Sequence, residues 1–167
     1  APFHQIRIRM QFKNVVIQSL TAVDAPVRMT SAQIGERLQP AMERLGLRPG
    51  FIEDITGIIA RRFWKNGTQP SDAATMAAEQ AIDEAGIERD KIGVLINTSV
   101  CKDYLEPSTA CLVHGNLGLH ERCLNFDIGN ACLAFLNGMD VAARMIERGE
   151  VEYALIVDGE SSGPITE

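Results

Sequence analysis

Cys132 is the residue of this sequence best placed to do chemistry. It follows the apolar approach "NFDIGNA", and a long pattern of small and apolar residues typical of a helix begins directly behind it. Unpaired backbone N–H groups and the helix dipole favour an anion at such a helix start, so they would stabilise a thiolate there. The same N–H groups could hold the oxyanion of a tetrahedral intermediate. The pattern therefore indicates a cysteine nucleophile, and a buried structural cysteine is the alternative.

The residues around Cys132 are small, which would leave room beside the sulfur for an acyl chain. Ala131, Ala134 and Gly138 form this small-residue neighbourhood. We assign Asn130, Ala131 and Gly138 to an oxyanion and acyl pocket.

Two rival interpretations come from other classes of protein. Cys111-x-x-His114 and His120-x-x-Cys123 carry four zinc-type ligands that could close a tetrahedral structural site. However, the loop between the two pairs has only five residues, and the first pair falls in an expected core helix. We therefore expect no metal site. The other rival is a non-catalytic scaffold in which Cys132 is inert.

The elements that must position Cys132 follow from hydrophobic periodicity and from helix-end signals. A capping box of Thr30 and Gln33 predicts a helix start, and Pro40 should end or kink that helix early. Ser71 is the expected cap of a helix that Gly86 ends. Pro107 is the expected first residue of a helix that runs to about residue 118. Strands are expected over residues 12–23, 57–64, 91–100, 123–129 and 152–160.

Strands alternate with helices, which predicts an α/β fold. Parallel strands joined by helices form βαβ units, so we expect a mixed, mainly parallel sheet of about five strands with helices on both faces. The helix behind Cys132 should end at Gly149. No low-complexity linker interrupts the chain, so we expect one domain over residues 10–167, preceded by a short basic extension at residues 1–9.

Composition excludes several classes of protein. The 167 residues carry a formal net charge of −6 with 46% hydrophobic residues, so we expect no nucleic acid as the main partner. No apolar run reaches the ~18 residues of a membrane span, and the first residues lack the apolar core of a secretory signal. Four cysteines without a C-x-x-C pair favour a reducing cytoplasm. Neither common nucleotide-binding glycine fingerprint is present.

Several segments together resemble thiolase-superfamily condensing enzymes of the ketoacyl-acyl carrier protein synthase III type. They are "TGIIARR", "SDAATMAAEQAIDEAGIERDKIGVLINTS", "PSTACLVHGNLGL" and "FDIGNACLAFLNGMDVAARMIERGEVEYALIVDGE". The resemblance covers about residues 10–160. Within that group, "NTSVCKDYLEPSTA" and "NACLAFLNGMDVAARM" are most similar to the acyl-CoA condensing enzyme of bacterial long-chain olefin and β-lactone biosynthesis. The resemblance implies the N-terminal half of a thiolase-like fold.

The chemistry implied by this resemblance is a Claisen condensation. Cys132 would take an acyl group from a fatty acyl-CoA, and a second acyl-CoA would attack the acyl-enzyme without decarboxylation to give a β-keto acid. Decarboxylation of a malonyl thioester, as in the synthase III enzymes, is the alternative source of the carbanion. Coenzyme A thioesters would be the substrates, and no cofactor is expected.

The resemblance also implies a role for Glu106. The olefin-pathway enzymes have a Glu in this motif that crosses the dimer interface and is proposed as the base for the α-proton. A carboxylate is a weak base, and burial in an acyl tunnel would make it stronger. An exposed carboxylate near a helix start is the alternative interpretation.

The family completes its site with a His and an Asn in its second half, which this chain does not match. His114 and His120 fall on and just after an expected helix, and His4 lies in the extension. We therefore expect a second polypeptide that carries the His and the Asn, and a dimer of such units. The alternative is that this sequence is a piece of a longer protein.

The contacts to coenzyme A are expected to differ from the family pattern. Synthase III enzymes often have Trp and Arg just before their "TGI", where this chain has Phe51 and Ile55. Adenine could stack on Phe51. Arg61 and Arg62 are candidate phosphate contacts, with a solvated arginine pair as the alternative.

Overall fold

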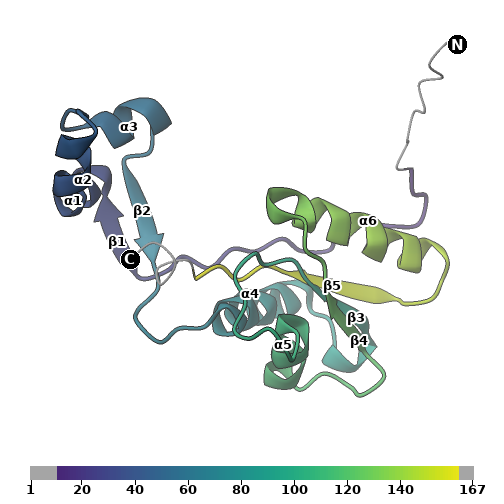
Figure 1. The fold of residues 1–167 in the computed structure, drawn as a ribbon. Coiled ribbons are helices and arrows are strands. Elements are labelled where there is room, and N and C mark those ends of the chain that lie inside the picture. Colours follow the sequence, from purple (N-terminus) through teal and green to yellow (C-terminus); the bar gives the residue numbers. More distant parts are fainter. Residues whose placement is uncertain (1–10, 162–167) are drawn as a thin grey trace, which may run out of the picture. The chain divides into compact units, whose positions relative to one another are not determined.

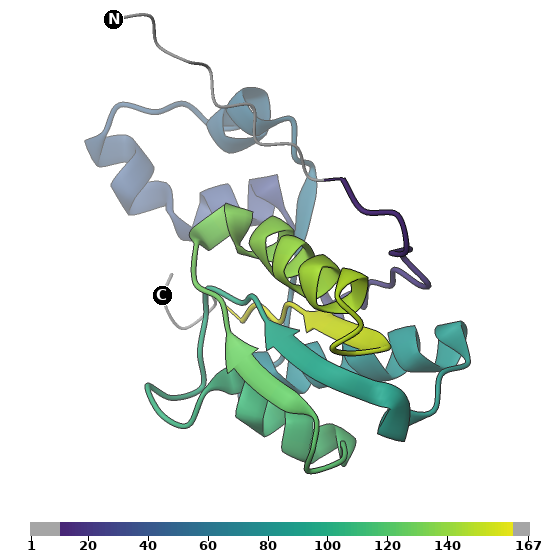
Figure 2. The same ribbon diagram turned by 90° about the vertical axis from the view of Figure 1, so that its right-hand side faces the viewer.

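The computed structural model describes residues 11–161, whose contacts divide into two compact units (Figures 1 and 2). The large unit comprises residues 11–22 and Gln69–Glu160. The small unit comprises Val23–Thr68 and residue 161.

The large unit is built on a parallel sheet of three strands. β3 (Ile92–Asn97) lies between β4 (Leu124–Asp127) and β5 (Tyr153–Val157) and pairs in parallel with both. Successive side chains of a strand point to opposite faces, so the continuously apolar β3 can bury both of its faces.

Helices cover both faces of this sheet (Figure 2). On one face, α4 (Pro70–Ala85) and α5 (Thr109–Leu117) pack with Leu95 of β3 in a core that also holds Val113 and Ile82. On the other face, Val94 and Ile96 of β3 pack with α6 (Ala134–Glu147). Two short 3₁₀ turns, η1 (Arg89–Lys91) and η2 (Ala131–Leu133), precede β3 and α6.

The C-terminal helix ends predicted at glycines are correct. The predicted N-terminal starts of two helices, α4 and α5, are wrong. Gly86 ends α4 in a left-handed conformation, as predicted. The cap of α4 is Gln69 rather than Ser71, because Gln69 and Asp72 exchange hydrogen bonds across the first turn. The helix predicted from Pro107 begins only at Thr109, because the Ser108 side chain caps it by accepting a hydrogen bond from the Cys111 N–H.

The small unit contains an antiparallel strand pair. β1 (Val27–Thr30) pairs with β2 (Ala60–Phe63), and α1 (Ser31–Arg37), α2 (Gln39–Arg44) and α3 (Phe51–Thr56) lie between them in the chain. The predicted capping box of Thr30 and Gln33 is present. The helix also ends early as predicted, and Pro40 stands in the first turn of the next one.

Two predictions about strands are wrong. Residues 12–23 form no strand, because the described chain offers them no ladder partner, and Val16, Ile17 and Leu20 are exposed. The five strands form a sheet of three and a separate pair rather than one sheet. The large unit nevertheless has the predicted α/β layering.

None of the helices in the described part of the chain combines the length and hydrophobicity that a bilayer crossing requires.

Candidate active site

Cys132 lies in η2, the single turn between the end of β4 and the start of α6, as the sequence predicted. Its side chain is exposed. The Leu133 N–H donates a 3.0 Å hydrogen bond to the Asn130 carbonyl, which closes this turn. The Asn130 side chain also donates to the Asn137 side chain at 2.7 Å and so ties the turn to α6.

The backbone directly before Cys132 is strained. Ala131 has a φ of 44°, and within residues 11–161 it is the one non-glycine residue with a positive φ. An L-residue avoids this left-handed region because its Cβ comes close to the carbonyl oxygen. Such strain gathers at functional sites, where the surrounding structure holds it in place.

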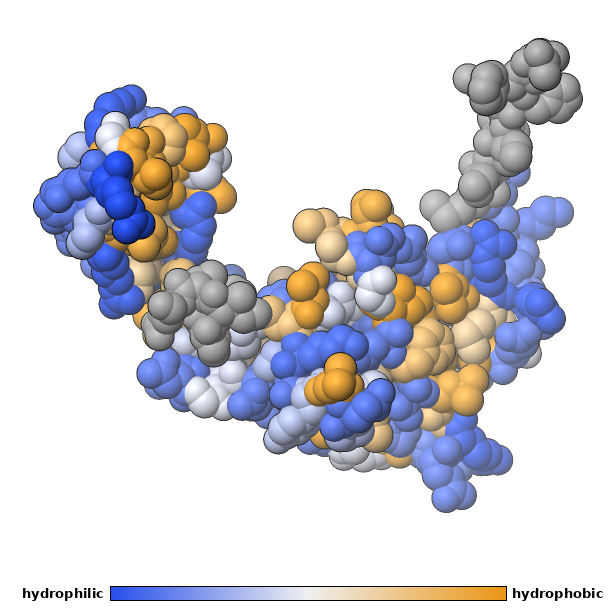
Figure 3. Space-filling model, viewed as in Figure 1, coloured by the Kyte–Doolittle hydropathy of each residue, from blue (hydrophilic) through white to orange (hydrophobic). Residues whose placement is uncertain are grey.

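The surface around this turn is apolar. Leu133 and Leu136 are both largely exposed. Figure 3 shows apolar atoms gathered at the surface over the start of α6. An exposed thiol beside apolar side chains suits an acyl chain as reaction partner.

Gly138 has a packing role in this structure. A Cβ at this position would lie 2.9 Å from Thr98 Cγ2 and 3.3 Å from Ile156 Cγ2. The space beside Gly138 is therefore filled by the sheet, which lets α6 approach closely. Its assignment to an acyl pocket stays a prediction.

The four thiols differ in their surroundings. Cys132 and Cys111 are exposed, whereas Cys101 and Cys123 are buried. Burial raises the pKa of the Cys123 thiol, since a thiolate is poorly solvated there. Accessibility therefore leaves Cys132 and Cys111 as candidate nucleophiles, and only Cys132 stands at a strained strand-to-helix junction.

Glu106 is exposed in the segment between β3 and α5. Its neighbours Tyr104 and Leu105 are also exposed, Leu105 to 91%. Glu106 therefore lies at an exposed tip beside an apolar side chain.

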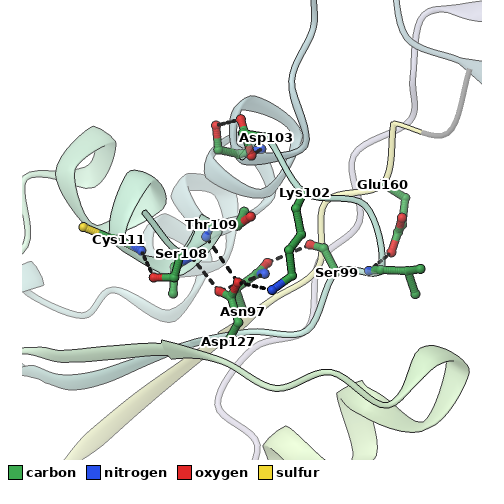
Figure 4. Close-up of polar contacts among 12 residues, drawn as sticks. Asn97, Ser99, Lys102, Asp103, Ser108, Thr109, Cys111, Asp127 and Glu160 are labelled. Atoms are coloured by element: carbon green, nitrogen blue, oxygen red, sulfur yellow. Dashed lines mark hydrogen bonds and ion pairs between the residues drawn. The ribbon is translucent and has the colours of Figure 1, made fainter. Parts of the chain in front are cut away.

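Asp127, the last residue of β4, forms a polar centre that the sequence did not predict (Figure 4). Its carboxylate accepts hydrogen bonds from the backbone N–H groups of Thr109 and Ala110 at 3.2 and 2.8 Å. It also accepts from the Asn97 side chain at 3.2 Å and forms a 3.1 Å ion pair with Lys102. The sequence holds one signal for the contact between Asp127 and the start of α5. It has an Asp at a strand end and a Ser-Thr pair at a helix start.

A second carboxylate group lies at the end of β5. Glu160 accepts hydrogen bonds from the N–H groups of Val100 and Cys101 at 2.6 and 3.1 Å. Burial raises the pKa of the neighbouring Asp158, and the charge of Glu160 and a hydrogen bond to it raise that pKa further.

The candidate coenzyme A contacts all lie in the small unit. Phe51 is the first residue of α3. Arg61 donates to the Ser31 hydroxyl at 3.3 Å. Arg62 donates to the Ala25 carbonyl at 3.3 Å and pairs with Asp24 at 3.2 Å. Both arginines thus have intramolecular partners, and their assignment to coenzyme A stays a prediction.

The histidines and cysteines of the zinc alternative do not form a ligand cluster. Within residues 11–161 no group of three or more His, Cys, Asp and Glu residues could hold a metal ion. His114 Nε2 instead lies 3.2 Å from the His120 carbonyl oxygen, and His120 Nδ1 accepts from the Arg122 N–H at 3.0 Å. His4 and the basic extension at residues 1–9 lie outside the described residues.

Comparison with known proteins identifies relatives of the chain. The family model for 3-oxoacyl-[acyl-carrier-protein (ACP)] synthase III matches residues 126–166. An acyl-CoA:acyl-CoA alkyltransferase of Xanthomonas campestris pv. campestris is 56% identical over 158 residues, which are 95% of this chain and 47% of that protein. One from Shewanella oneidensis is 37% identical and is matched over 45% of its length. The chain thus spans about half the length of the curated relatives it matches.

Solved structures give the same result. Cerulenin-bound OleA of Xanthomonas campestris has a TM-score of 0.86 and 58% identity, over 90% of this chain and 44% of that chain. The 3-oxoacyl-(acyl carrier protein) synthase III FabH of Xanthomonas oryzae pv. oryzae has a TM-score of 0.88 and 56% identity. The match covers 93% of this chain and 46% of that chain.

The chain therefore has the thiolase-like fold of ketoacyl synthase III-type condensing enzymes, and the resemblance expected from its sequence is confirmed. In sequence it matches about half of the acyl-CoA:acyl-CoA alkyltransferase of Xanthomonas campestris, which is 56% identical to it.

Proposed function

We propose that this chain supplies the acyl-accepting half of an acyl-CoA condensing enzyme, with Cys132 as nucleophile. The observation that carries the proposal is the exposed Cys132 directly behind the strained Ala131, at the start of α6. Hydrogen bonds of the Asn130 carbonyl and side chain hold the turn, and the free N–H groups of a helix start favour a thiolate and an oxyanion there. Asn130 and Ala131 would line the oxyanion side.

The proposed reaction has three steps. The Cys132 thiolate attacks the carbonyl of a fatty acyl-CoA, and coenzyme A leaves as its thiol after taking up a proton. A base removes an α-proton from a second acyl-CoA, and the resulting carbanion attacks the acyl-enzyme and releases the Cys132 thiolate. Water then hydrolyses the β-ketoacyl-CoA to a β-keto acid and coenzyme A. Loss of CO₂ from a malonyl thioester is the alternative source of the carbanion.

Glu106 is the proposed base, acting across an interface in the site of another unit. Its exposure beside Leu105 fits a residue that enters a partner. Solved OleA variants from Xanthomonas campestris carry a single replaced Glu or Cys, and those two positions are 26 residues apart, as Glu106 and Cys132 are here.

The assembly and the remaining substrate contacts are also proposals. A His and an Asn would come from the half of the relatives that this chain does not match, either as a second polypeptide or as another part of the same protein. Phe51, Arg61 and Arg62 would bind the coenzyme A head group. The cytoplasm is the proposed location, where the four cysteine thiols would stay reduced. Olefin and β-lactone biosynthesis would be the downstream use of the β-keto acid.

The test is the mass of the acyl-enzyme. The chain, assembled with the missing half of a relative, is incubated with a fatty acyl-CoA and digested to locate the acyl group. We expect the acyl mass on Cys132, its loss in Cys132→Ala and its retention in Cys111→Ala, the matched exposed cysteine. An acyl group on Cys111, or none on the assembled protein, would support the inert scaffold instead.

A further inference from the structure

The segment that carries Glu106, residues 98–108, leaves the sheet after β3 and returns to it at the start of α5; we call it the Glu106 arm. Its tip is exposed, with Tyr104 at 60% and Leu105 at 91%. Because these side chains of the tip are largely in solvent, polar contacts on either side of it are needed to hold it in one position.

The Asp127 carboxylate anchors the arm on both sides of its tip (Figure 4). Before the tip, Lys102 forms an ion pair with Oδ2 at 3.1 Å. After the tip, Thr109 N–H donates to Oδ2 at 3.2 Å and Ala110 N–H donates to Oδ1 at 2.8 Å. Glu106 therefore lies between two segments that one carboxylate holds together.

The Asp127 side chain is only 10% exposed, so its three hydrogen bonds are largely shielded from water, whereas the Lys102 side chain is 43% exposed. Charge-assisted hydrogen bonds to a shielded carboxylate are stronger than neutral ones, and water competes less for them. Asn97 supplies the fourth contact from the central strand at 3.2 Å.

Asp127 also belongs to the segment that delivers the nucleophile. It ends β4, and the chain runs from it through Asn130 into η2 and Cys132. The Asp127 side chain thus links the two ends of the Glu106 arm to the strand that leads to Cys132.

Two other carboxylates hold the early part of the arm. Asp103 accepts from the Ser71 hydroxyl and N–H at 2.6 and 3.1 Å. Glu160 accepts from the N–H groups of Val100 and Cys101. Neither lies on the strand that leads to Cys132, so Asp127 alone of the three joins the arm to that strand.

We propose that Asp127 is a positioning residue that sets Glu106 for the condensation step through Lys102 and the first turn of α5. This inference rests on the proposed function of Cys132 and Glu106. A base must reach the α-proton within hydrogen-bond distance, and a shift of about 1 Å can cost about 100-fold in rate. Acylation of Cys132 needs no such proton transfer, so it should tolerate a displaced arm.

Asp127→Asn is the sharpest variant, because both carboxylate oxygens face donors. An amide keeps one acceptor and turns the other into an NH₂ group that opposes a donor. Lys102→Met removes the ion pair alone. Glu150→Gln is the matched control, since it deletes one carboxylate from an exposed ion pair with Arg148 at the far end of α6.

Acylation of Cys132 and release of β-keto acid are measured separately on the assembled enzyme, with the folded fraction fixed by circular dichroism. We expect Asp127→Asn to lower condensation per acylated enzyme by about 10-fold or more, with acylation within about 3-fold of the unmodified protein. Lys102→Met should lower condensation less, and Glu150→Gln should change neither step. A parallel fall of both steps in Asp127→Asn would make its role merely structural and overturn the proposal.

A double-mutant cycle separates this proposal from the proposed function. If Asp127 acts through Glu106, then adding Asp127→Asn to Glu106→Gln should cause little further loss of condensation. Full additivity of the two losses would overturn the proposal and leave Glu106 as the base. Absence of acyl-enzyme in the unmodified assembly would instead refute the proposed function itself.

Hydrogen exchange of the chain gives a readout that needs no substrate. Asp127→Asn should speed amide exchange in residues 98–110 at least several-fold relative to Glu150→Gln, because the arm loses its shared anchor. Unchanged exchange there would show that Asp127 does not hold the arm, and the proposal would fail.

Discussion

At the scale of single residues, Ala131 shows how the backbone can prepare a site. Its φ of 44° places an alanine where glycine is favoured by about 1–2 kcal/mol. We expect Ala131→Gly to raise the free energy of unfolding by up to about 1 kcal/mol, because glycine accepts this conformation without a Cβ clash but loses more entropy on folding. Ala131→Val should lower it by about 1–3 kcal/mol.

Urea denaturation of the three proteins tests this prediction. A lower stability for Ala131→Gly than for the unmodified chain would mean that Ala131 is not strained. Acylation of Cys132 should slow in Ala131→Gly even where stability rises, since a glycine lets the turn visit other conformations.

Asp158 gives a prediction about pH. Burial, and then Glu160, raises the pKa of Asp158, so the folded chain binds this proton more tightly than the unfolded chain does. The ionised group therefore destabilises the fold at neutral pH. That cost is relieved as the pH falls through the raised pKa, and it disappears below the ordinary Asp pKa of about 4.

Asp158→Asn should accordingly raise the free energy of unfolding at pH 7, and this gain should shrink as the pH approaches about 4. Urea denaturation across this pH range measures it, with Glu150→Gln as control. An equal gain at both ends of the range would contradict the assignment of the pKa shift.

At the scale of elements, the contact between α6 and the sheet depends on Gly138. A Cβ there would meet Thr98 Cγ2 at 2.9 Å and Ile156 Cγ2 at 3.3 Å, so α6 would have to move away from the sheet. Gly138→Ala should lower the free energy of unfolding by about 1–3 kcal/mol, the usual range for overpacking.

Gly115 of α5 is the matched control, since a Cβ there meets nothing within 4 Å. Gly115→Ala should raise stability by up to about 1 kcal/mol, because alanine favours a helix. Thermal unfolding of both variants tests this prediction. A Gly138→Ala variant as stable as the unmodified chain would show that α6 is free to shift.

The elements also show what the sequence could predict. β3, β4, β5 and the glycine-ended helices follow from local apolar patterns, and so does the position of Cys132 at the change from strand to helix. Residues 12–23 have a strand pattern but no strand, because a strand needs a partner that local pattern does not reveal. Asp127 was missed for a similar reason: its contacts join β3, β4 and α5, and only the assembled fold brings these together.

At the scale of the whole molecule, several large apolar side chains of the large unit are exposed to solvent. Val16, Ile17 and Leu20 are exposed in the N-terminal segment of the large unit, as are Leu133 and Leu136 around the start of α6. Exposed apolar side chains that form a continuous patch usually mark an interface, so we expect these residues to contact further protein. The chain also spans about half the length of its curated relatives, so the other half is the natural cover for this surface.

The 167-residue chain alone is therefore expected to self-associate and to show no condensation. Sedimentation should give oligomers that grow with concentration, since exposed leucines and valines of different copies would pack together.

Adding the other half of a relative as a separate polypeptide should give a defined complex, in which β-keto acid is released and hydrogen exchange around Leu133 and Leu136 slows. Leu136→Glu should weaken that complex, whereas Glu150→Gln, beyond the C-terminal end of α6, should not. A lone chain that stays monomeric at high concentration and condenses acyl-CoA would refute the requirement for a partner.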